Sequence, residues 1–265
     1  MGLPASHHRD EFSEFCEGIR RLTGIDLTLY KRAQMERRIR TFAGRRAATS
    51  LDDYLQVLAA DREQLEQFLD RVTINVSQLW RNPEQFARLA DHVIPELAAE
   101  GRLRCWSAGC SYGAEAFTVA AIARTVAPDA RIEVHGTDID RRMVERAREG
   151  VFSADDARSV PRDQLGRWFE RLDDGGHRAR PELRAVTRFE TGDLLRDSFP
   201  AGRYDLVLCR NVVIYFTEDV RDRLHARLVE TLRPGGYLMI GSSERVASPA
   251  ALGLTTVHPF IYRKA

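Results

Sequence analysis

The chain has 265 residues, of which 43% are hydrophobic and 30% charged, and its formal net charge at pH 7 is +1. This length is enough for one large α/β domain and a smaller domain, each with its own core. The nearly balanced charge gives no general attraction to nucleic acid or to an anionic membrane, and no apolar run approaches the roughly 20 residues that a membrane-spanning helix needs.

The four cysteines, Cys16, Cys105, Cys110 and Cys209, include no C-x-x-C pair. They therefore indicate neither a zinc site nor a disulfide framework, and the histidines show no metal-binding spacing either. The first ten residues are polar and lack the apolar core of a secretory signal. We expect a soluble cytoplasmic protein without a metal site, in which the thiols stay reduced.

Helical patterns predominate from Asp10 to about Ala99. Apolar residues recur there at helical spacing, as in Phe12, Phe15, Ile19 and Leu22. Ser50 is followed by two aspartates and is a predicted N-cap, and Pro83 is a predicted first-turn residue of a later helix. We assign residues 1–80 to an all-helical N-terminal domain.

From Arg104 onward, strands and helices alternate. The expected strands are Arg104–Ala108, Ile132–Thr137, Arg188–Glu190, Tyr204–Cys209, Tyr237–Ile240 and Thr256–Tyr262. The expected helices are Ala114–Val126, a helix through Met143 and Arg148, and Glu218–Leu232. This alternation is typical of a mostly parallel sheet with helices on both faces. We assign residues 81–265 to this α/β domain, with a small antiparallel β insert at about 168–190, where an Asp-Asp-Gly-Gly turn signal occurs.

A glycine-containing turn at residues 109–113 follows the first strand and opens a helix, which is the context of a nucleotide-binding turn. Gly109 and Gly113 would let the backbone approach a ligand, although a tight strand-to-helix turn alone would also require glycine. Asp138 ends the second strand, where its two oxygens can accept both hydroxyls of a ribose. The alternative role of Asp138 is to cap the next helix, for which Asp140 is the better candidate.

Glu115 lies in the first turn of the helix after the glycine turn. It can serve there simply as a partner of the helix dipole. It can also meet the positive amino group or sulfonium of S-adenosylmethionine, whereas it would repel a pyrophosphate, which disfavours NAD. At the next strand end, Asp193 can accept from the exocyclic amine of an adenine while Leu194 packs against the ring.

Polar residues also crowd the end of the strand Tyr204–Cys209. Arg210, Asn211 and Tyr215 follow this apolar run directly. Ligands of open α/β sheets bind at the carboxyl ends of strands, so these three residues are further site candidates, although strand-end residues can also be merely solvated.

Four segments together resemble the CheR family of chemotaxis receptor methyltransferases. They are Thr73–Arg81 (TINVSQLWR), Trp106–Glu115, Thr137–Asp140 and Cys209–Phe216. The helical N-terminal part and the segment Ile240–Glu244 are similar as well, so the resemblance covers nearly the whole chain. It implies a Rossmann-like S-adenosylmethionine-dependent methyltransferase sheet. It also implies a protein-glutamate O-methyltransferase that forms methyl esters on the cytoplasmic helices of chemoreceptors and releases S-adenosylhomocysteine.

The resemblance also implies roles for individual residues. The cofactor-binding residues would be Asn75, Ser77, Arg81, Gly109, Glu115, Asp138, Asp193, Leu194, Arg210 and Asn211. Arg81 and Tyr215 match the residues expected nearest the methyl transfer. Arg81 would hold one oxygen of the acceptor carboxylate and leave the other to attack, and Tyr215 would orient the reacting groups.

Two features depart from the family pattern. Tyr112 and Ala114 replace the threonine and the first glutamate of the family's Thr-Gly-Glu-Glu. The insert around Asp173–Pro181 looks shorter than in the enteric type, whose insert docks on a receptor tail peptide, so this docking is left open.

Basic residues are concentrated in the N-terminal domain, at Lys31, Arg32, Arg37, Arg38, Arg40, Arg45 and Arg46. They form either a solvated surface or a docking face for an acidic receptor helix bundle. The net charge is near zero and no base-reading motif appears, so we expect no nucleic acid partner. We also expect no direct membrane insertion and a monomer. Two alternative functions are a methyltransferase of another acceptor and a non-catalytic module that senses S-adenosylmethionine or S-adenosylhomocysteine.

Overall fold

The computed structural model describes residues 10–46, 48–72 and 77–265. The chain forms two compact units. The helical unit consists of Met1–Ile74 and Tyr215–Val220, and the larger unit consists of Asn75–Ile214 and Arg221–Ala265. This division falls between residues 74 and 75, whereas the sequence analysis placed a domain boundary between residues 80 and 81.

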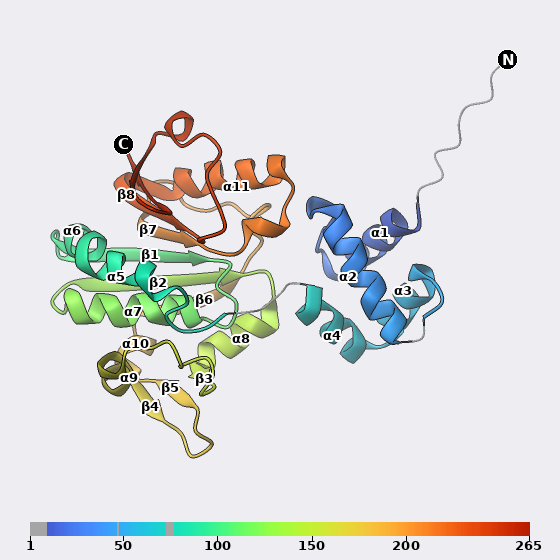
Figure 1. Cartoon of the computed structure of the whole chain (residues 1–265), viewed down its shortest axis with the longest axis horizontal. Helices are drawn as coiled ribbons and strands as arrows, with labels where there is room; N and C mark the ends of the chain where they lie inside the picture. Colours follow the sequence, from blue (N-terminus) through green and yellow to red (C-terminus); the bar gives the residue numbers. More distant parts are fainter. Residues whose placement is uncertain (1–9, 47, 73–76) are drawn as a thin grey trace. The chain divides into compact units, whose positions relative to one another are not determined.

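The helical unit contains α1 (Glu11–Thr23), the 3₁₀ turn η1 (Leu27–Leu29), α2 (Arg32–Arg45), α3 (Leu51–Ala60) and α4 (Arg62–Val72) (Figure 1). The side chain of Ser50 accepts a hydrogen bond from Asp53 N, so the predicted N-cap is confirmed. The ring of Phe15 stacks on Tyr54 and meets the edge of Phe68, with centroids 6.1 and 5.8 Å apart. This aromatic cluster joins α1, α3 and α4 into one core, and the expected all-helical domain is confirmed.

The larger unit is built on a seven-stranded sheet with the order β6-β2-β1-β7-β8-β10-β9. The strands are β1 (Arg102–Ala108), β2 (Arg131–Asp138), β6 (Thr187–Thr191), β7 (Tyr204–Cys209), β8 (Leu232–Ile240), β9 (Leu254–His258) and β10 (Ile261–Lys264). The first five in the spatial order are parallel, and β10 and β9 continue the sheet antiparallel. The predicted α/β class is confirmed. The single last strand expected at Thr256–Tyr262 was wrong, because a turn at Pro259 and Phe260 divides that stretch into β9 and β10.

Helices flank this sheet on both sides. The helices that follow the N-terminal ones are α5 (Pro83–Arg88), the π-helical turn η2 (Leu89–Val93), α6 (Ile94–Ala98), α7 (Ala114–Val126), α8 (Arg141–Glu149), α9 (Arg162–Trp168), α10 (Pro181–Arg184) and α11 (Glu218–Thr231), with the 3₁₀ turns η3 (Val213–Tyr215) and η4 (Ala250–Leu252). In Figure 1, α7 lies below the sheet and α11 above it. Pro83 begins α5 as predicted.

A second, three-stranded antiparallel sheet has the order β3-β5-β4. Its strands are β3 (Val151–Phe152), β4 (Phe169–Arg171) and β5 (His177–Ala179). Gly175, with φ +85°, makes the turn between β4 and β5. The expected β insert is therefore present. It differs from the range 168–190 in that β3 lies before this range, while β6, which begins inside it, belongs to the large sheet.

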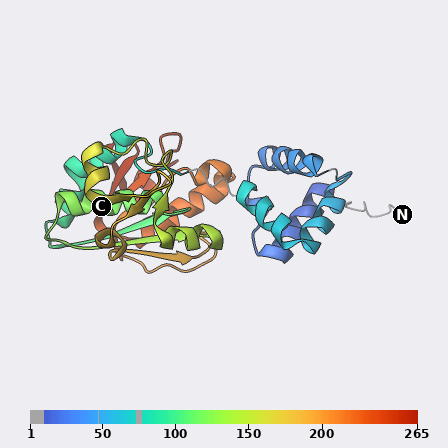
Figure 2. The same cartoon turned by 90° about the horizontal axis from the view of Figure 1, so that it is seen from below.

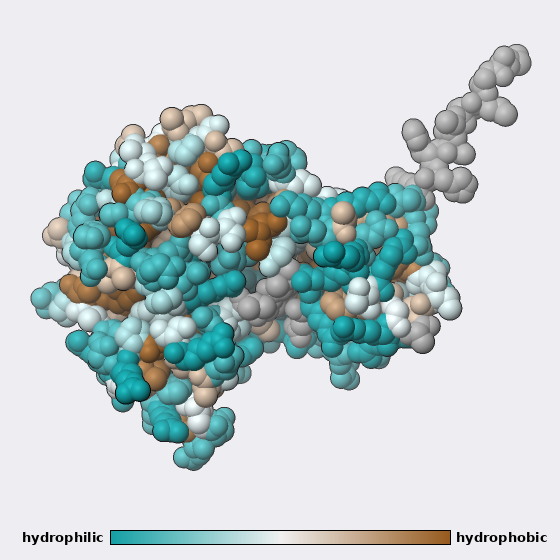
Figure 3. Space-filling view, in the orientation of Figure 1, coloured by the Kyte–Doolittle hydropathy of each residue, from teal (hydrophilic) through white to brown (hydrophobic). Residues whose placement is uncertain are grey.

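The core of the larger unit lies between the central strands and their helices, as the fully buried Trp106 and Phe117 illustrate. All four cysteines are free and buried, and burial raises the pKa of Cys16 to about 12. Figure 2 shows the cartoon of each unit from a second side. Figure 3 shows that the surface seen in the view of Figure 1 is mostly hydrophilic, with scattered apolar residues. Within the described ranges, no helix combines the length and the apolar character needed to cross a membrane.

Candidate functional site

The candidate site residues of the larger unit follow the carboxyl ends of parallel strands. The glycine turn follows β1, Asp138 ends β2, Asp193 follows β6 and Arg210 follows β7. Since β6, β2, β1 and β7 are parallel neighbours, these strand ends lie at one edge of the sheet.

Backbone conformations that side chains seldom adopt are concentrated in this region. Trp80, Asn82, Ser111 and Asn211 have positive φ values of 52°, 62°, 48° and 61°. The two asparagine positions are the more easily accommodated, whereas a tryptophan in this conformation is strained. Strained backbone of this kind is typical of ligand-binding and catalytic loops, where the surrounding structure enforces it.

The glycine turn is explained by its own packing. Gly109 and Cys110 both donate backbone hydrogen bonds to the carbonyl of Thr137, at 2.8 and 3.0 Å. Gly109 has a φ of +80°, and a Cβ atom there would lie 2.5 Å from Cγ2 of Val212. At Gly113, with φ +86°, a Cβ would lie 3.0 Å from Cβ of Ala147. Both glycines are required by the turn itself, so they do not identify a ligand.

Asp138 is almost enclosed, with 8% of its surface exposed. Its Oδ2 accepts from Ser111 N at 2.7 Å and its Oδ1 from Asp140 N at 2.9 Å. Burial raises the pKa of this carboxyl to about 6. Asp140 caps α8 by accepting from Arg142 N and Met143 N, as the sequence suggested. Ile139 also donates a backbone hydrogen bond to this carboxylate, which keeps acceptor capacity for a further donor.

Glu115 and Arg210 form a buried ion pair. Glu115 Oε2 lies 3.2 Å from Arg210 Nη1, and Glu115 Oε1 accepts from Ser107 Oγ at 2.7 Å. The Arg210 side chain is only 2% exposed. The sequence identified both residues as separate cofactor ligands, but did not predict that they pair. The negative charge of Glu115 is therefore largely balanced inside the protein.

Arg210 also anchors the segment that carries Arg81. Its Nη2 donates to Arg81 O at 2.6 Å and to Asn82 Oδ1 at 3.1 Å. Its Nε and Nη2 donate to Gln85 Oε1 at 3.2 and 2.8 Å, and its guanidinium lies 4.8 Å from the ring centroid of Phe86. Sequence reasoning missed Gln85, whose only signal is a polar residue on the buried side of a short helix.

The turn after β6 is organised by its own side chains. Asp193 Oδ1 accepts from Leu195 N at 2.8 Å, and Asp193 Oδ2 lies 3.6 Å from Arg196 Nε. Leu194 is buried, and its carbonyl accepts from Arg227 Nε at 3.1 Å. The adenine contacts expected of Asp193 and Leu194 stay predictions.

Glu244 joins the loops after β7 and β8. Its carboxylate accepts from Asn211 N at 3.0 Å, Val213 N at 3.1 Å and Gly241 N at 2.7 Å. A Cβ at Gly241 would lie 2.7 Å from Glu244 Oε2, so the loop closes tightly around the carboxylate. The sequence placed Glu244 only in a family-like segment and did not predict that it holds the Asn211 loop.

The segment Ser77–Arg81 is tied to the larger unit at several points. The Ser77 carbonyl accepts from the hydroxyl of Tyr112, and Leu79 N donates to Asp156 O at 3.0 Å. Trp80 N donates to Thr118 Oγ1 at 3.1 Å. Asn75, another expected cofactor ligand, lies outside the described residues.

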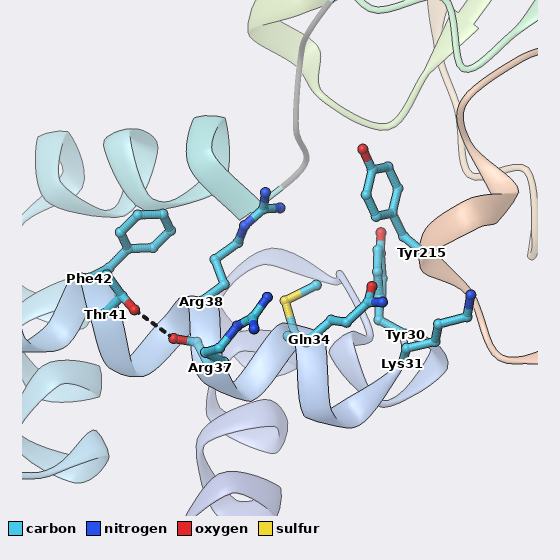
Figure 4. Close-up of a pocket in the computed structure, with 9 residues that line it drawn as sticks. Tyr30, Lys31, Gln34, Arg37, Arg38, Thr41, Phe42 and Tyr215 are labelled. Carbon is cyan, nitrogen blue, oxygen red and sulfur yellow. Dashed lines mark hydrogen bonds between the residues drawn. The ribbon is translucent and has the colours of Figure 1, made fainter. Parts of the chain in front are cut away.

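Tyr215 belongs to the helical unit, whereas Arg81 belongs to the larger one. Tyr215 O accepts from Lys31 N at 2.8 Å, and Tyr215 borders a cavity of about 370 Å³ against α2 (Figure 4). The cavity is lined by Tyr30, Lys31, Gln34, Met35, Arg37, Arg38, Thr41, Phe42 and Tyr215. The expected proximity of Arg81 and Tyr215 stays a prediction.

Family models match both parts of the chain. Residues 10–73 match the CheR methyltransferase all-alpha domain, and residues 75–257 match the CheR methyltransferase SAM-binding domain. The chain belongs to the CheR methyltransferase family. The resemblance found in the sequence is thereby confirmed, and this CheR-family protein is an S-adenosylmethionine-dependent methyltransferase.

Similar proteins named chemotaxis protein methyltransferase match along most of their length. The protein from Listeria innocua is 34% identical over 256 residues, which cover 96% of this chain and 97% of the relative. The protein from Salmonella typhimurium is 32% identical over 249 residues, which cover 89% of this chain and 84% of the relative.

The CheR-family chain offers groups that suit S-adenosylmethionine. Asp138 would accept from a ribose hydroxyl, and Leu194, an apolar residue beside Asp193, would pack against an adenine. Nε2 of Gln85 is buried and has no hydrogen-bond partner among the described residues, so it can donate to an anionic group such as the cofactor carboxylate. In the same described part of the chain, no group of three His, Cys, Asp or Glu side chains is placed to hold a metal ion.

Proposed function

We propose that this CheR-family enzyme methylates glutamate side chains on the cytoplasmic helices of chemoreceptors, and that it does so as a monomer in the cytoplasm. The observation that carries the choice of acceptor is the cationic cavity beside Tyr215 in the helical unit. The relatives named chemotaxis protein methyltransferase support the same assignment.

The charges around this cavity suit an acidic partner. Figure 4 shows Lys31, Arg37 and Arg38 on the α2 side of the cavity and Tyr215 on the other side. Arg37 is exposed and makes no ion pair within the described residues, and Arg38 Nη1 donates to Val72 O at 3.5 Å. A receptor helix rich in ionised glutamates would be attracted to such a surface.

Not all basic residues of α2 are available for a partner. Arg32 pairs with Asp10 and Glu36, and Arg40 pairs with Glu11 and Glu36. These ion pairs neutralise part of the basic face that the sequence suggested. The proposed docking surface is therefore smaller than the full set of basic residues in the N-terminal domain, and it centres on Arg37 and Arg38.

The acceptor glutamate needs no general base, because its carboxylate is already ionised at neutral pH, well above the ordinary pKa of about 4.3. Bound S-adenosylmethionine supplies a methyl group already activated on a sulfonium. The protein has to position and orient the reacting groups. Arg81 would hold one carboxylate oxygen, and Arg210 fixes the Arg81 backbone through its bond to Arg81 O. Tyr215 would orient the acceptor with its hydroxyl.

The proposal is tested by incubating the protein with methyl-labelled cofactor and receptor cytoplasmic fragments. We expect base-labile label on the receptor, and we expect Arg81→Ala to reduce transfer about a hundredfold or more, as the loss of a transition-state contact does. Arg141→Ala, which removes an exposed arginine paired with Glu145, is the matched control and should transfer normally.

Other outcomes distinguish the alternatives. Label that resists base would indicate a different acceptor, and cofactor binding without any transfer would indicate a sensing module. Arg37→Glu should raise KM for the receptor fragment several-fold, while Arg40→Ala, which removes an internally paired arginine, should have little effect. Equal effects of the two variants would contradict the proposed docking surface.

A further inference from the structure

Tyr112 stands in the glycine turn at a position where the family motif has threonine. Its side chain is directed toward the region of the small sheet. The ring is 5% exposed, its centroid lies 6.3 Å from that of Phe152 in β3, and the guanidinium of Arg146 lies 4.2 Å from its centroid. The bulk of Tyr112 is thus accommodated by Phe152 and Arg146.

The hydroxyl of Tyr112 reaches two acceptors. It contacts the carbonyl of Ser77 and lies 2.8 Å from Asp156 Oδ1. Because a phenol has one hydrogen, the two acceptors share it. Burial, together with the neighbouring Asp156 carboxylate, raises the pKa of Tyr112, so the phenol stays protonated and remains a donor.

Asp156 is itself held firmly. Its Oδ2 accepts from Ser153 N at 2.9 Å and from Ser153 Oγ at 2.8 Å, and its carbonyl accepts from Leu79 N. Tyr112, Asp156 and the backbone from Ser77 to Leu79 therefore form one hydrogen-bonded network. A threonine at residue 112 would carry its hydroxyl on Cβ, far short of the phenol oxygen that meets Ser77.

We propose that Tyr112 is a positioning residue that holds the Ser77 end of the cofactor-binding segment. This inference rests on the proposed role of Ser77 in binding S-adenosylmethionine. The other end of the segment is fixed independently, by Thr118 at Trp80 and by Arg210 at Arg81. Loss of the Tyr112 hydroxyl therefore loosens the Ser77 end selectively, and it lowers cofactor affinity without unfolding the site.

The test compares two tyrosine-to-phenylalanine variants of the full chain by calorimetric titration with S-adenosylhomocysteine. Tyr112→Phe is expected to weaken binding about three- to tenfold, the effect of one lost hydrogen bond. Tyr237→Phe is the matched control, because Tyr237 is also 5% exposed and its hydroxyl donates to Glu96 Oε2 at 2.7 Å. Tyr237→Phe should lower the melting temperature about as much as Tyr112→Phe does, but it should leave the Kd for S-adenosylhomocysteine unchanged.

A double-mutant cycle with Asp156→Ala tests the network itself. Alanine removes the Oδ1 that accepts from the Tyr112 hydroxyl, so the effects of Tyr112→Phe and Asp156→Ala on the Kd should be less than additive. Additive effects, or equal losses of affinity in Tyr112→Phe and Tyr237→Phe, would overturn the positioning role.

Ser77→Ala separates this inference from the proposed function. If Ser77→Ala weakens binding and Tyr112→Phe binds normally, the role of Tyr112 is wrong and that of Ser77 stands. If Ser77→Ala binds normally, the assignment of Ser77 to the cofactor is wrong, and positioning through Ser77 is overturned with it.

Discussion

Asp138 holds a carboxylate at the end of β2 whose charge should change within an accessible pH range. Burial raises its pKa to about 6, and only the ionised form can accept from both hydroxyls of a ribose. Affinity for S-adenosylhomocysteine should therefore be complete above this pKa and fall below it, by at most about tenfold per pH unit.

The measurement is the Kd of S-adenosylhomocysteine from about pH 8 down to about pH 5, above the range where most carboxyls titrate. Asp138→Asn should bind weakly and show no such fall in this interval. A wild-type Kd that does not change across the interval would exclude Asp138 as the acidic ribose ligand.

The sequence identified the residue types of the site better than their partners. Glu115, Asp138 and Arg210 could be selected because they lie near the carboxyl ends of strands. The ion pair between Glu115 and Arg210 could not be predicted, because it joins a side chain in the first turn of α7 to one that follows β7, and no local pattern relates the two. Glu244 escaped notice for the same reason, since its three donors are backbone groups of two different loops.

At the scale of single elements, α11 contains an uncompensated polar group. His225 has 0% exposed surface, and neither ring nitrogen has a partner among the described residues. Burial, with a smaller contribution from Arg221, lowers its pKa from 6.5 to about 4. The unfolded chain therefore binds a proton at a higher pH than the folded chain does.

The stability that neutral His225 contributes to the folded protein is fully present above about pH 6.5. The free energy of unfolding then decreases as the pH falls toward about 4, by about 3 kcal/mol in total for this residue. Urea unfolding at a series of pH values measures this loss. His225→Leu should flatten that part of the profile, and an unchanged profile in the variant would assign the acid sensitivity to other groups.

The predictability of the elements depended on how clearly their ends are marked. α7 and β7 were expected at their observed bounds, because an apolar run in each is bounded by glycine or polar residues. The sequence predicted one strand where the structure has β9 and β10. Both halves of that stretch favour strands, and only the turn at Phe260, with φ 66°, separates them. β8 begins earlier than expected, at Leu232, although Pro234 and two glycines lie within it.

At the scale of the whole molecule, the net charge does not indicate where the charged side chains are concentrated. A total of +1 suggests no preferred partner, but α2 contributes Arg37 and Arg38 to one cavity. The pairing of Arg32 with Asp10 and of Arg40 with Glu11 could not be deduced from the sequence, because it depends on how α1 and α2 pack. The pairs that both arginines form with Glu36 follow from four-residue spacing within α2.

The helical unit includes a short segment that is distant in sequence. Lys31 N donates to Tyr215 O, Thr217 N donates to Leu29 O, and the rings of Tyr30 and Phe216 meet with centroids 5.0 Å apart. Phe216→Ala should therefore destabilise the helical unit, with a local cost of about 3 kcal/mol or more for a buried ring.

Hydrogen exchange of the full chain measures where that loss occurs. Exchange should accelerate at Leu27–Leu29 and at the start of α2. Phe199→Ala, which removes a ring packed 4.6 Å from Trp106, is the control and should leave exchange in the helical unit unchanged. Acceleration confined to the larger unit in Phe216→Ala would contradict this assignment.

The same segment sets an order of events during synthesis. A nascent chain that has released only α1 to α4 lacks Phe216 and the two backbone hydrogen bonds of the Tyr215–Val220 segment. Helices α1 to α4 therefore complete their packing only after β1, β2, β6 and β7, which follow them in the chain, have been translated. Domains commonly fold as units in the order of their synthesis, but here the N-terminal unit must wait for a part that arrives late.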